Sequence, residues 1–224
     1  EATSHPKQSD PGLDMQPYYS AIATRSSSLC YSKYAAAVSR ALAEAGAADQ
    51  ARVFRDSAEA AWRFGRDPNV RVSTEFTNDD GELIRWIEAP SPHPRRVLLA
   101  AAQLWLATGE QTYRDALDQA EVITAFEAEV EGMQARLSVL EMAAIAQHSD
   151  RFPDGWGERV QSRIVTDADE IVAAVNTHAY RRVHAAPDTN RYYIAAWGGH
   201  QALRQIGVLV AAYGLTGDTD YRNA

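Results

Sequence analysis

One motif occurs twice and decides the fold: Thr108-Gly109-Glu110-Gln111-Thr112-Tyr113-Arg114-Asp115-Ala116 returns as Thr216-Gly217-Asp218-Thr219-Asp220-Tyr221-Arg222-Asn223-Ala224. Glycine readily takes the left-handed conformation that follows a helix C-terminus. The acidic residue after it suits the N-cap or first turn of a second helix. The tyrosine that comes next can pack back onto the first helix. Each copy therefore predicts the corner of an αα-hairpin.

A looser copy begins at Ala45-Gly46-Ala47 and ends at Phe54-Arg55-Asp56-Ser57-Ala58. The aromatic positions 54, 113 and 221 fit a repeat of about 54 residues, and periods of this size are typical of repeated helix pairs. One further copy is expected near residues 160–170. Phe152-Pro153-Asp154-Gly155-Trp156 separates two helices there without keeping the motif.

The pattern predicts helices over residues 28–45, 49–65, 94–107, 110–128, 133–147, 155–177 and 199–215, and another from 218 onward. Apolar residues at helical spacing predict three buried stripes: Ala35, Val38, Leu42 and Ala45; Leu98, Ala102, Trp105 and Leu106; and Leu203, Ile206, Val210 and Tyr213. Trp62, Trp105 and Tyr113 are predicted core residues. We therefore expect an all-α fold, an (α/α)6 toroid with an inner and an outer ring, of which about four hairpins are present.

Two segments depart from the helical pattern. Residues 70–88 alternate in polarity around Asn78-Asp79-Asp80-Gly81, which predicts a small β-hairpin insertion. Residues 1–27 are rich in Pro, Ser and Asp and predict an extended N-terminal segment, followed by a partial barrel domain over residues 28–224. The chain opens without Met and stops in the first turn of an expected helix, so we expect a fragment.

The composition excludes several classes of protein. A net charge of −8 argues against a general nucleic-acid binder and against docking on an anionic membrane. The longest apolar run, residues 97–102, is far shorter than the roughly 18 apolar residues of a membrane span. The single cysteine, Cys30, excludes an intrachain disulfide and a cysteine metal cluster, and we expect it to be a buried or half-buried thiol.

Several stretches, taken in chain order, resemble glycoside hydrolase family 9, the cellulase-like enzymes. They are Ser26-Ser27-Ser28 with residues 34–41, Ala58-Glu59-Ala60-Ala61-Trp62, residues 100–105 with Thr108-Gly109-Glu110, and Trp197-Gly198-Gly199 with Thr216-Gly217-Asp218 and Tyr221. The resemblance implies an (α/α)6 barrel that hydrolyses β-1,4-glucan or a related β-glycoside with inversion. It also implies a secreted or periplasmic bacterial protein.

The family uses an Asp in a D-A-G-D motif as general base and a Glu near its C-terminus as general acid. This chain has no D-A-G-D, and its nearest string, Asp167-Ala168-Asp169, is predicted to be solvated helix surface. We therefore assign no catalytic residue and interpret the chain as a central-to-C-terminal fragment that lacks both carboxylates. Pro94-Arg95-Arg96 and His200-Gln201-Ala202 also depart from the family pattern, which weakens the inference of cellulose specificity.

The candidate substrate-binding residues lie on an expected loop that enters the helix at 199–215: Arg191, Tyr192, Trp197, Gly198 and His200. Sugar rings pack on aromatic faces while charged and amide groups bind their hydroxyls. Alternatively, Tyr192 and Trp197 only wedge two helices apart. No zinc-binding histidine pattern occurs, so no metal or cofactor is predicted. The expected partner is an oligo- or polysaccharide, and the oligomeric state stays open.

Two other functions remain open. One is a different (α/α) toroid carbohydrate enzyme, either an unsaturated glucuronyl hydrolase or a polysaccharide lyase. The other is a non-catalytic helical-repeat scaffold. A scaffold would more often repeat a surface pattern in every hairpin, so the aromatic loop at residues 190–200 favours an enzyme.

Overall fold

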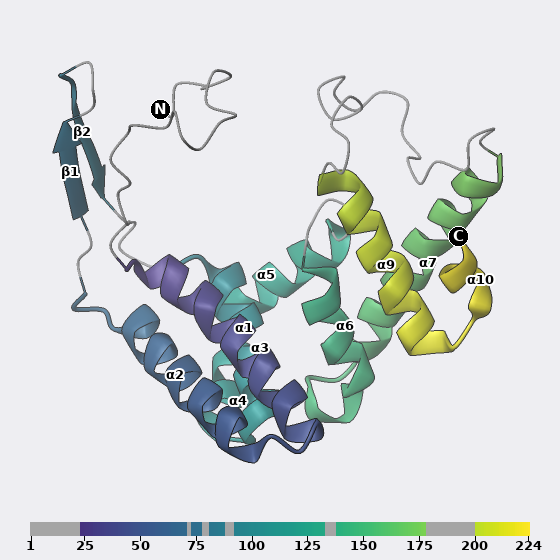
Figure 1. Ribbon diagram of the computed structural model, residues 1–224, viewed down its shortest axis with the longest axis horizontal. Helices are drawn as coiled ribbons and strands as arrows, with labels where there is room; N and C mark the ends of the chain where they lie inside the picture. Colours follow the sequence, from purple (N-terminus) through teal and green to yellow (C-terminus); the bar gives the residue numbers. More distant parts are fainter. Residues whose placement is uncertain (1–22, 71–72, 78–80, 88–91, 133–137, 178–199) are drawn as a thin grey trace, which may run out of the picture.

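The computed structural model describes residues 23–70, 73–77, 81–87, 92–132, 138–177 and 200–224. The structure is predominantly helical, as the all-α expectation requires (Figure 1). Its helices are α1 (Arg25–Glu44), α2 (Ala48–Arg66), α3 (Pro94–Thr108), α4 (Gln111–Leu117), α5 (Ala120–Glu131), α6 (Val139–Gln147), the 3-10 turn η3 (Ser149–Arg151), α7 (Trp156–Thr177), α9 (His200–Thr216) and α10 (Thr219–Asn223).

Two short strands, β1 (Ser73–Thr77) and β2 (Leu83–Ile87), lie between α2 and α3, within the range where the sequence predicts a hairpin. They pair antiparallel with Glu75 opposite Arg85, and these two side chains form an ion pair of 2.5 Å. Figure 1 shows the pair projecting beyond the end of α2 and away from the helices.

The two close copies of the motif have the same local geometry. Gly109 and Gly217 take left-handed φ angles of 71° and 72°. The Thr108 hydroxyl donates to the Leu104 carbonyl at 2.8 Å, and the Thr216 hydroxyl makes the matching 2.8 Å bond to the carbonyl of Ala212. In both corners the same hydroxyl accepts, at 3.1 Å, the amide N–H of the acidic residue after the glycine. The threonine thus satisfies groups at the end of one helix and the start of the next.

The other two corners keep the glycine without the threonine. Gly46 and Gly155 have φ angles of 78° and 79°, and they lie between α1 and α2 and between η3 and α7. Gly155 belongs to residues 152–156, which separate two helices without keeping the threonine–glycine motif. The left-handed glycine, rather than the flanking residues, is therefore what all four corners share.

Helices α1, α3, α6 and α9 run in the same direction. Near their starts, Arg96 of α3 donates to the Ser26 carbonyl of α1 at 2.8 Å. Near their ends, Arg40 of α1 donates to Gln103 of α3 at 3.0 Å. Helix α6 lies beside α3, and Gly207 and Gly214 of α9 lie against the first and the last residue of α6, Val139 and Gln147. The helices that follow each of these four return in the opposite direction (Figure 1).

Serine side chains allow α1 and α2 to pack closely. The hydroxyls of Ser32 and Ser39 donate to carbonyls of α2 at 2.8 and 2.7 Å, and both serines are buried. Gly65 of α2 lies against Leu29 and the backbone of α1, so that an added Cβ would be 2.6 Å from the Leu29 Cγ. Glycine on α2 and serines on α1 therefore allow the two helices to approach closely, with Leu29 of α1 packed against Gly65.

Helix α3 is the centre of the core, and its predicted stripe is confirmed: Leu98, Ala102 and Leu106 are buried, with Trp105 packed against them. The stripe predicted on α9 is wrong. Ile206, Val210 and Tyr213 are 49, 56 and 37% exposed, whereas the adjacent positions Val208, Leu209, Ala211 and Ala212 are buried. On α1, Ala35 is buried but Val38 is 40% exposed, because Ser32 and Ser39 occupy the face that meets α2.

Three details differ from the sequence prediction. Helix α1 begins at Arg25 rather than at residue 28, because Thr24 and Ser27 form a reciprocal capping box. The helix expected over residues 110–128 is divided into α4 and α5, since Gln119 takes an extended conformation (φ −69°, ψ 135°) between them. Asp167 is fully buried and paired with Arg163 at 2.9 Å, so the prediction of solvated surface at residues 167–169 is wrong for it.

Aromatic contacts join neighbouring hairpins. Trp62 of α2 and Tyr113 of α4 are buried, as expected, and meet edge to face with ring centroids 5.5 Å apart. Tyr221 of α10 donates from its hydroxyl to Asp169 of α7 at 2.7 Å. Cys30 is half-buried, in agreement with its expected environment. Within the described residues, the structure contains no helix that is long and apolar enough to cross a membrane.

Candidate functional site

The sequence-predicted substrate residues are not placed by the structure. Arg191, Tyr192, Trp197 and Gly198 lie outside the described residues. His200 is the first residue of α9, but its side chain is not among those that the structure describes. The predicted aromatic site therefore stays a prediction, and the candidate site in the described part of the chain is a polar region between α1, α3 and α6.

A buried amide, Gln103, holds this region together. It interrupts the apolar surface of α3 and is 2% exposed. Its Oε1 accepts from Arg40 Nη1 at 3.0 Å, and its Nε2 donates to the Glu141 carbonyl at 3.3 Å. Because a buried amide must find partners for its N–H and C=O groups, Gln103 fixes the positions of α1 and α6 relative to α3.

An ion pair links α1 directly to α6. The Lys33 ammonium lies 2.5 Å from Glu141 Oε1, and these side chains are only 10 and 11% exposed. The ammonium also lies 4.3 Å from the centroid of the Tyr34 ring. Burial opposes the charge on Lys33, but the hydrogen bond and charge of Glu141, with a contribution from Tyr34, outweigh it and raise the pKa of the lysine.

One cavity, which we call the α1–α6 pocket, has a volume of about 420 Å³. It is lined by Tyr34, Ala37, Arg40, Ala41 and Glu44 of α1, Gln103 of α3, and Leu140, Glu141, Ala144 and Gln147 of α6. The Tyr34 ring is 53% exposed. The pocket thus combines an accessible aromatic face with two amides and two carboxylates.

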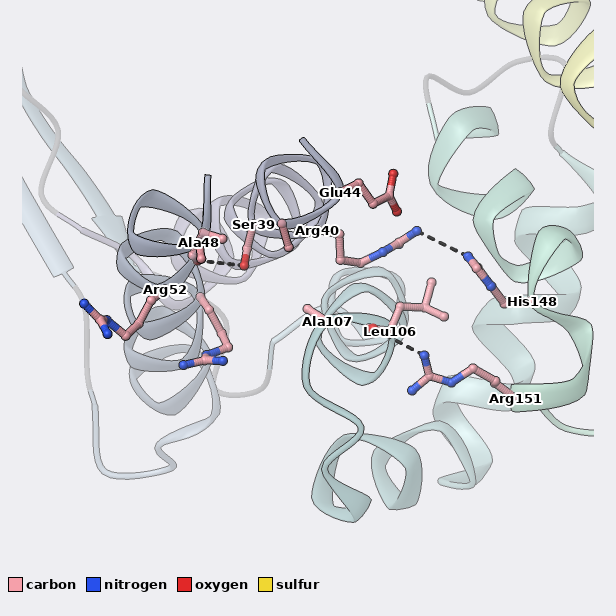
Figure 2. A pocket seen from close by; sticks show the side chains of 12 residues that line it. Ser39, Arg40, Glu44, Ala48, Arg52, Leu106, Ala107, His148 and Arg151 are labelled. Carbon is pink, nitrogen blue, oxygen red and sulfur yellow. Dashed lines mark hydrogen bonds between the residues drawn. The ribbon is translucent and has the colours of Figure 1, made fainter. Parts of the chain in front are cut away.

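Another cavity, which we call the corner pocket, has a volume of about 450 Å³ and shares Arg40 and Glu44 with the α1–α6 pocket. Its other lining residues are Ser39, Ala43, Ala48, Ala51, Arg52, Arg55, Leu106, Ala107, His148 and Arg151. Figure 2 shows Arg40 and His148 extending toward each other from facing elements, while Arg151 reaches from η3 toward Leu106.

The basic groups of the corner pocket are held by defined hydrogen bonds. Arg40 Nη2 lies 3.4 Å from His148 Nε2. Because a guanidinium can only donate, this contact is a hydrogen bond when Nε2 is the acceptor, which is the case in the neutral imidazole with its proton on Nδ1. Arg151 donates to the carbonyls of Leu106 and Trp105 at 3.3 and 3.0 Å, and its guanidinium lies 4.9 Å from the Trp105 ring centroid.

The pKa values of both Arg40 and His148 are lowered, which favours the neutral form of each side chain. Burial lowers the pKa of Arg40, and Arg151 lowers it further, against the opposing charge of Glu44. Burial also lowers the pKa of His148, and the charges of Arg40 and Arg151 add to this effect. The lining residues include four arginines and one glutamate, so they carry an excess of positive charge.

Sequence reasoning missed these residues as a site. Arg40 and His148 are 108 positions apart, and no short motif connects them. One signal was available: Gln103 is polar within the otherwise apolar stretch 97–107 of α3, and a buried amide needs partners from neighbouring elements. Among the described residues, no group of three or more His, Cys, Asp or Glu side chains has the arrangement of a metal site.

Comparisons with known proteins do not assign the chain to a family. Neither protein-family profiles, curated proteins nor solved structures give a match to the chain.

Proposed function

We propose that the chain forms part of an (α/α)6 toroid and that it contributes saccharide-binding surface to an inverting glycoside hydrolase acting on β-1,4-glucan or a related β-glycoside. The observation that carries the proposal is the α1–α6 pocket, where the half-exposed Tyr34 ring stands beside amides and carboxylates. Aromatic faces pack on the C–H face of a sugar, and amide or carboxylate groups bind its hydroxyls.

The lengths of the connections support the toroid. The corners that lead from α1, α3 and α9 to their returning helices contain two or three residues, whereas 27 residues separate α2 from α3 and 22 separate α7 from α9. In (α/α) toroids, the loops that enter the inner helices carry the cleft. The predicted residues Arg191, Tyr192, Trp197 and Gly198 belong to the connection that enters α9, and His200 begins that helix.

The parallel direction of α1, α3, α6 and α9 supports the same arrangement, since an inner ring of hairpins requires it. Exposed apolar residues on α9, at positions 206, 210 and 213, mark a face that a neighbouring inner helix would cover. No catalytic carboxylate is assigned within the described residues, so the proposal concerns substrate binding by this chain and hydrolysis by the enzyme of which it is part.

Binding of a cello-oligosaccharide tests the proposal, with Tyr34→Ala as the variant. Loss of one aromatic–sugar contact should weaken binding by about tenfold, which corresponds to about 1.4 kcal/mol. Tyr31→Ala is the matched control, since Tyr31 is also on α1 and 49% exposed but bonds to Ser57 of α2 outside the pocket. Isothermal titration calorimetry would measure both. An affinity that Tyr34→Ala leaves unchanged, or lowers no more than Tyr31→Ala does, overturns the assignment of this pocket.

A further inference from the structure

The corner pocket is basic in a chain that is acidic overall. Four arginines line it, and Glu44 carries the only carboxylate among its described lining residues. The whole chain has a net charge of −8. Cations gathered in a cavity of such a protein raise the local concentration of anions there, because the low-dielectric walls focus the field.

Two of the four arginines are already neutralised. Arg52 pairs with Asp49 at 3.0 Å, and Arg55 lies 3.6 and 4.0 Å from Asp56 and Glu59. Both arginines are on α2 and are well exposed. They therefore contribute to the rim of the pocket rather than to its uncompensated charge.

Arg40 and Arg151 are different. Neither forms an ion pair within the described part of the chain, and their hydrogen bonds go to Gln103 and His148 and to the carbonyls of Leu106 and Trp105. A guanidinium has five N–H donors, so each retains donors beyond those bonds. The neutral His148 imidazole adds a further N–H at Nδ1. These donors come from α1, from the residue after α6 and from η3, so they approach the pocket from different directions.

We infer that the corner pocket binds a tetrahedral oxyanion, either free phosphate or a phosphate monoester, between Arg40, His148 and Arg151. A phosphate offers three oxygens in different directions, whereas a carboxylate offers two in one plane, and donors from three elements suit the former. A dianion also compensates two guanidinium charges. Burial is the main cause of the lowered pKa of His148, and the charges of Arg40 and Arg151 add to it; an anion beside these groups would offset that second contribution. The two pockets share Arg40 and Glu44, but this inference does not rest on saccharide binding in the α1–α6 pocket.

Glu44 makes the inference sharply testable, because its charge opposes an anion in the same cavity. Inorganic phosphate is titrated into the 224-residue chain at constant ionic strength, with sulfate, a hexose phosphate and acetate as the other ligands. Glu44→Gln should tighten phosphate binding between about threefold and tenfold, the effect of one unit charge in a partly solvated site. Arg40→Gln should weaken it by about tenfold or more.

The exposed pair of Arg159 with Glu127 supplies matched controls, because Glu127→Gln and Arg159→Gln remove the same charges far from the pocket. Equal affinity for Glu44→Gln and Glu127→Gln overturns the inference, as does binding of acetate as tight as that of phosphate or the lack of saturable binding. If Arg40→Gln does not fold, the gain in Glu44→Gln decides the question. A hexose phosphate that binds more tightly than phosphate identifies the monoester as the ligand, and the reverse order identifies free phosphate. Loss of saccharide binding in Tyr34→Ala leaves all these results unchanged.

Discussion

Replacing Gly65 by alanine tests the close packing of α1 on α2. An added Cβ would lie 2.6 Å from Leu29 Cγ, 2.9 Å from Leu29 Cδ2 and 3.1 Å from the Arg25 carbonyl oxygen. Leu29 is fully buried and the carbonyl belongs to the backbone, so neither can move away without a shift of the helix. Such overpacking costs about 1–3 kcal/mol, against a gain of up to about 1 kcal/mol from the higher helix propensity of alanine.

The matched control is Gly214→Ala. Gly214 is also near the end of its helix, α9, but an added Cβ there has its nearest contact at 3.7 Å, with the flexible end of Gln147. The propensity gain is then unopposed, and this variant should be more stable than the parent chain by up to about 1 kcal/mol. The two variants share the propensity effect, so the difference between them isolates the clash.

Urea unfolding followed by circular dichroism would measure the free energy of unfolding of both variants. Gly65→Ala should be less stable than Gly214→Ala by about 1–3 kcal/mol. This is a gap of about 2–4 °C in Tm for each kcal/mol in a chain of this size. Equal stabilities would refute the close approach of α1 to α2 at Gly65.

Three further predictions follow from single contacts. Ser39→Ala removes a buried 2.7 Å hydrogen bond to a carbonyl of α2, so thermal unfolding should show a loss of about 1 kcal/mol; an unchanged Tm contradicts the bond. The 2.7 Å bond to Asp169 raises the pKa of the Tyr221 phenol to about 12, as burial does for Tyr113, so Tyr221→Phe should reduce the late phenolate step of the ultraviolet titration by one tyrosine; a late step of unchanged amplitude would count against the contact. His148 has a folded-state pKa below its usual 6.5, so the unfolded chain binds more protons and stability should fall as the pH drops below about 6.5; His148→Asn should flatten this slope, and a slope that persists would assign it to another group.

The sequence predicted the corners between paired helices better than it predicted which face of each helix is buried. A corner depends on residues that are neighbours in the chain, and Gly109 with Thr108 specifies it locally. Which face of a helix is buried depends on what lies beside it. For α3, with neighbours on both sides, the stripe with Leu98 was predicted correctly. For α9 the apolar residues at 206, 210 and 213 are exposed. A different set of apolar residues, at positions 208, 209, 211 and 212, is buried instead.

The candidate site shows the same limit. Tyr34 and Glu141 belong to one pocket because α1 and α6 run side by side over Gln103, and no local pattern specifies that pairing. The aromatic residues that the sequence did single out, Tyr192 and Trp197, lie outside the described residues. Local signals thus identified turn chemistry and residue types, whereas the pockets arise from contacts between distant parts of the chain.

The threonine–glycine corners also bear on how the protein is made. The bonds that close each corner join residues only two to four positions apart, as between Thr108 and Leu104 or between Asp218 and Thr216. Such contacts form early, since little chain entropy is lost in closing so short a loop. A hairpin can therefore close as soon as its second helix has left the ribosome, before the next hairpin has been translated. We therefore expect the α1–α2 hairpin to form before α3 packs against it.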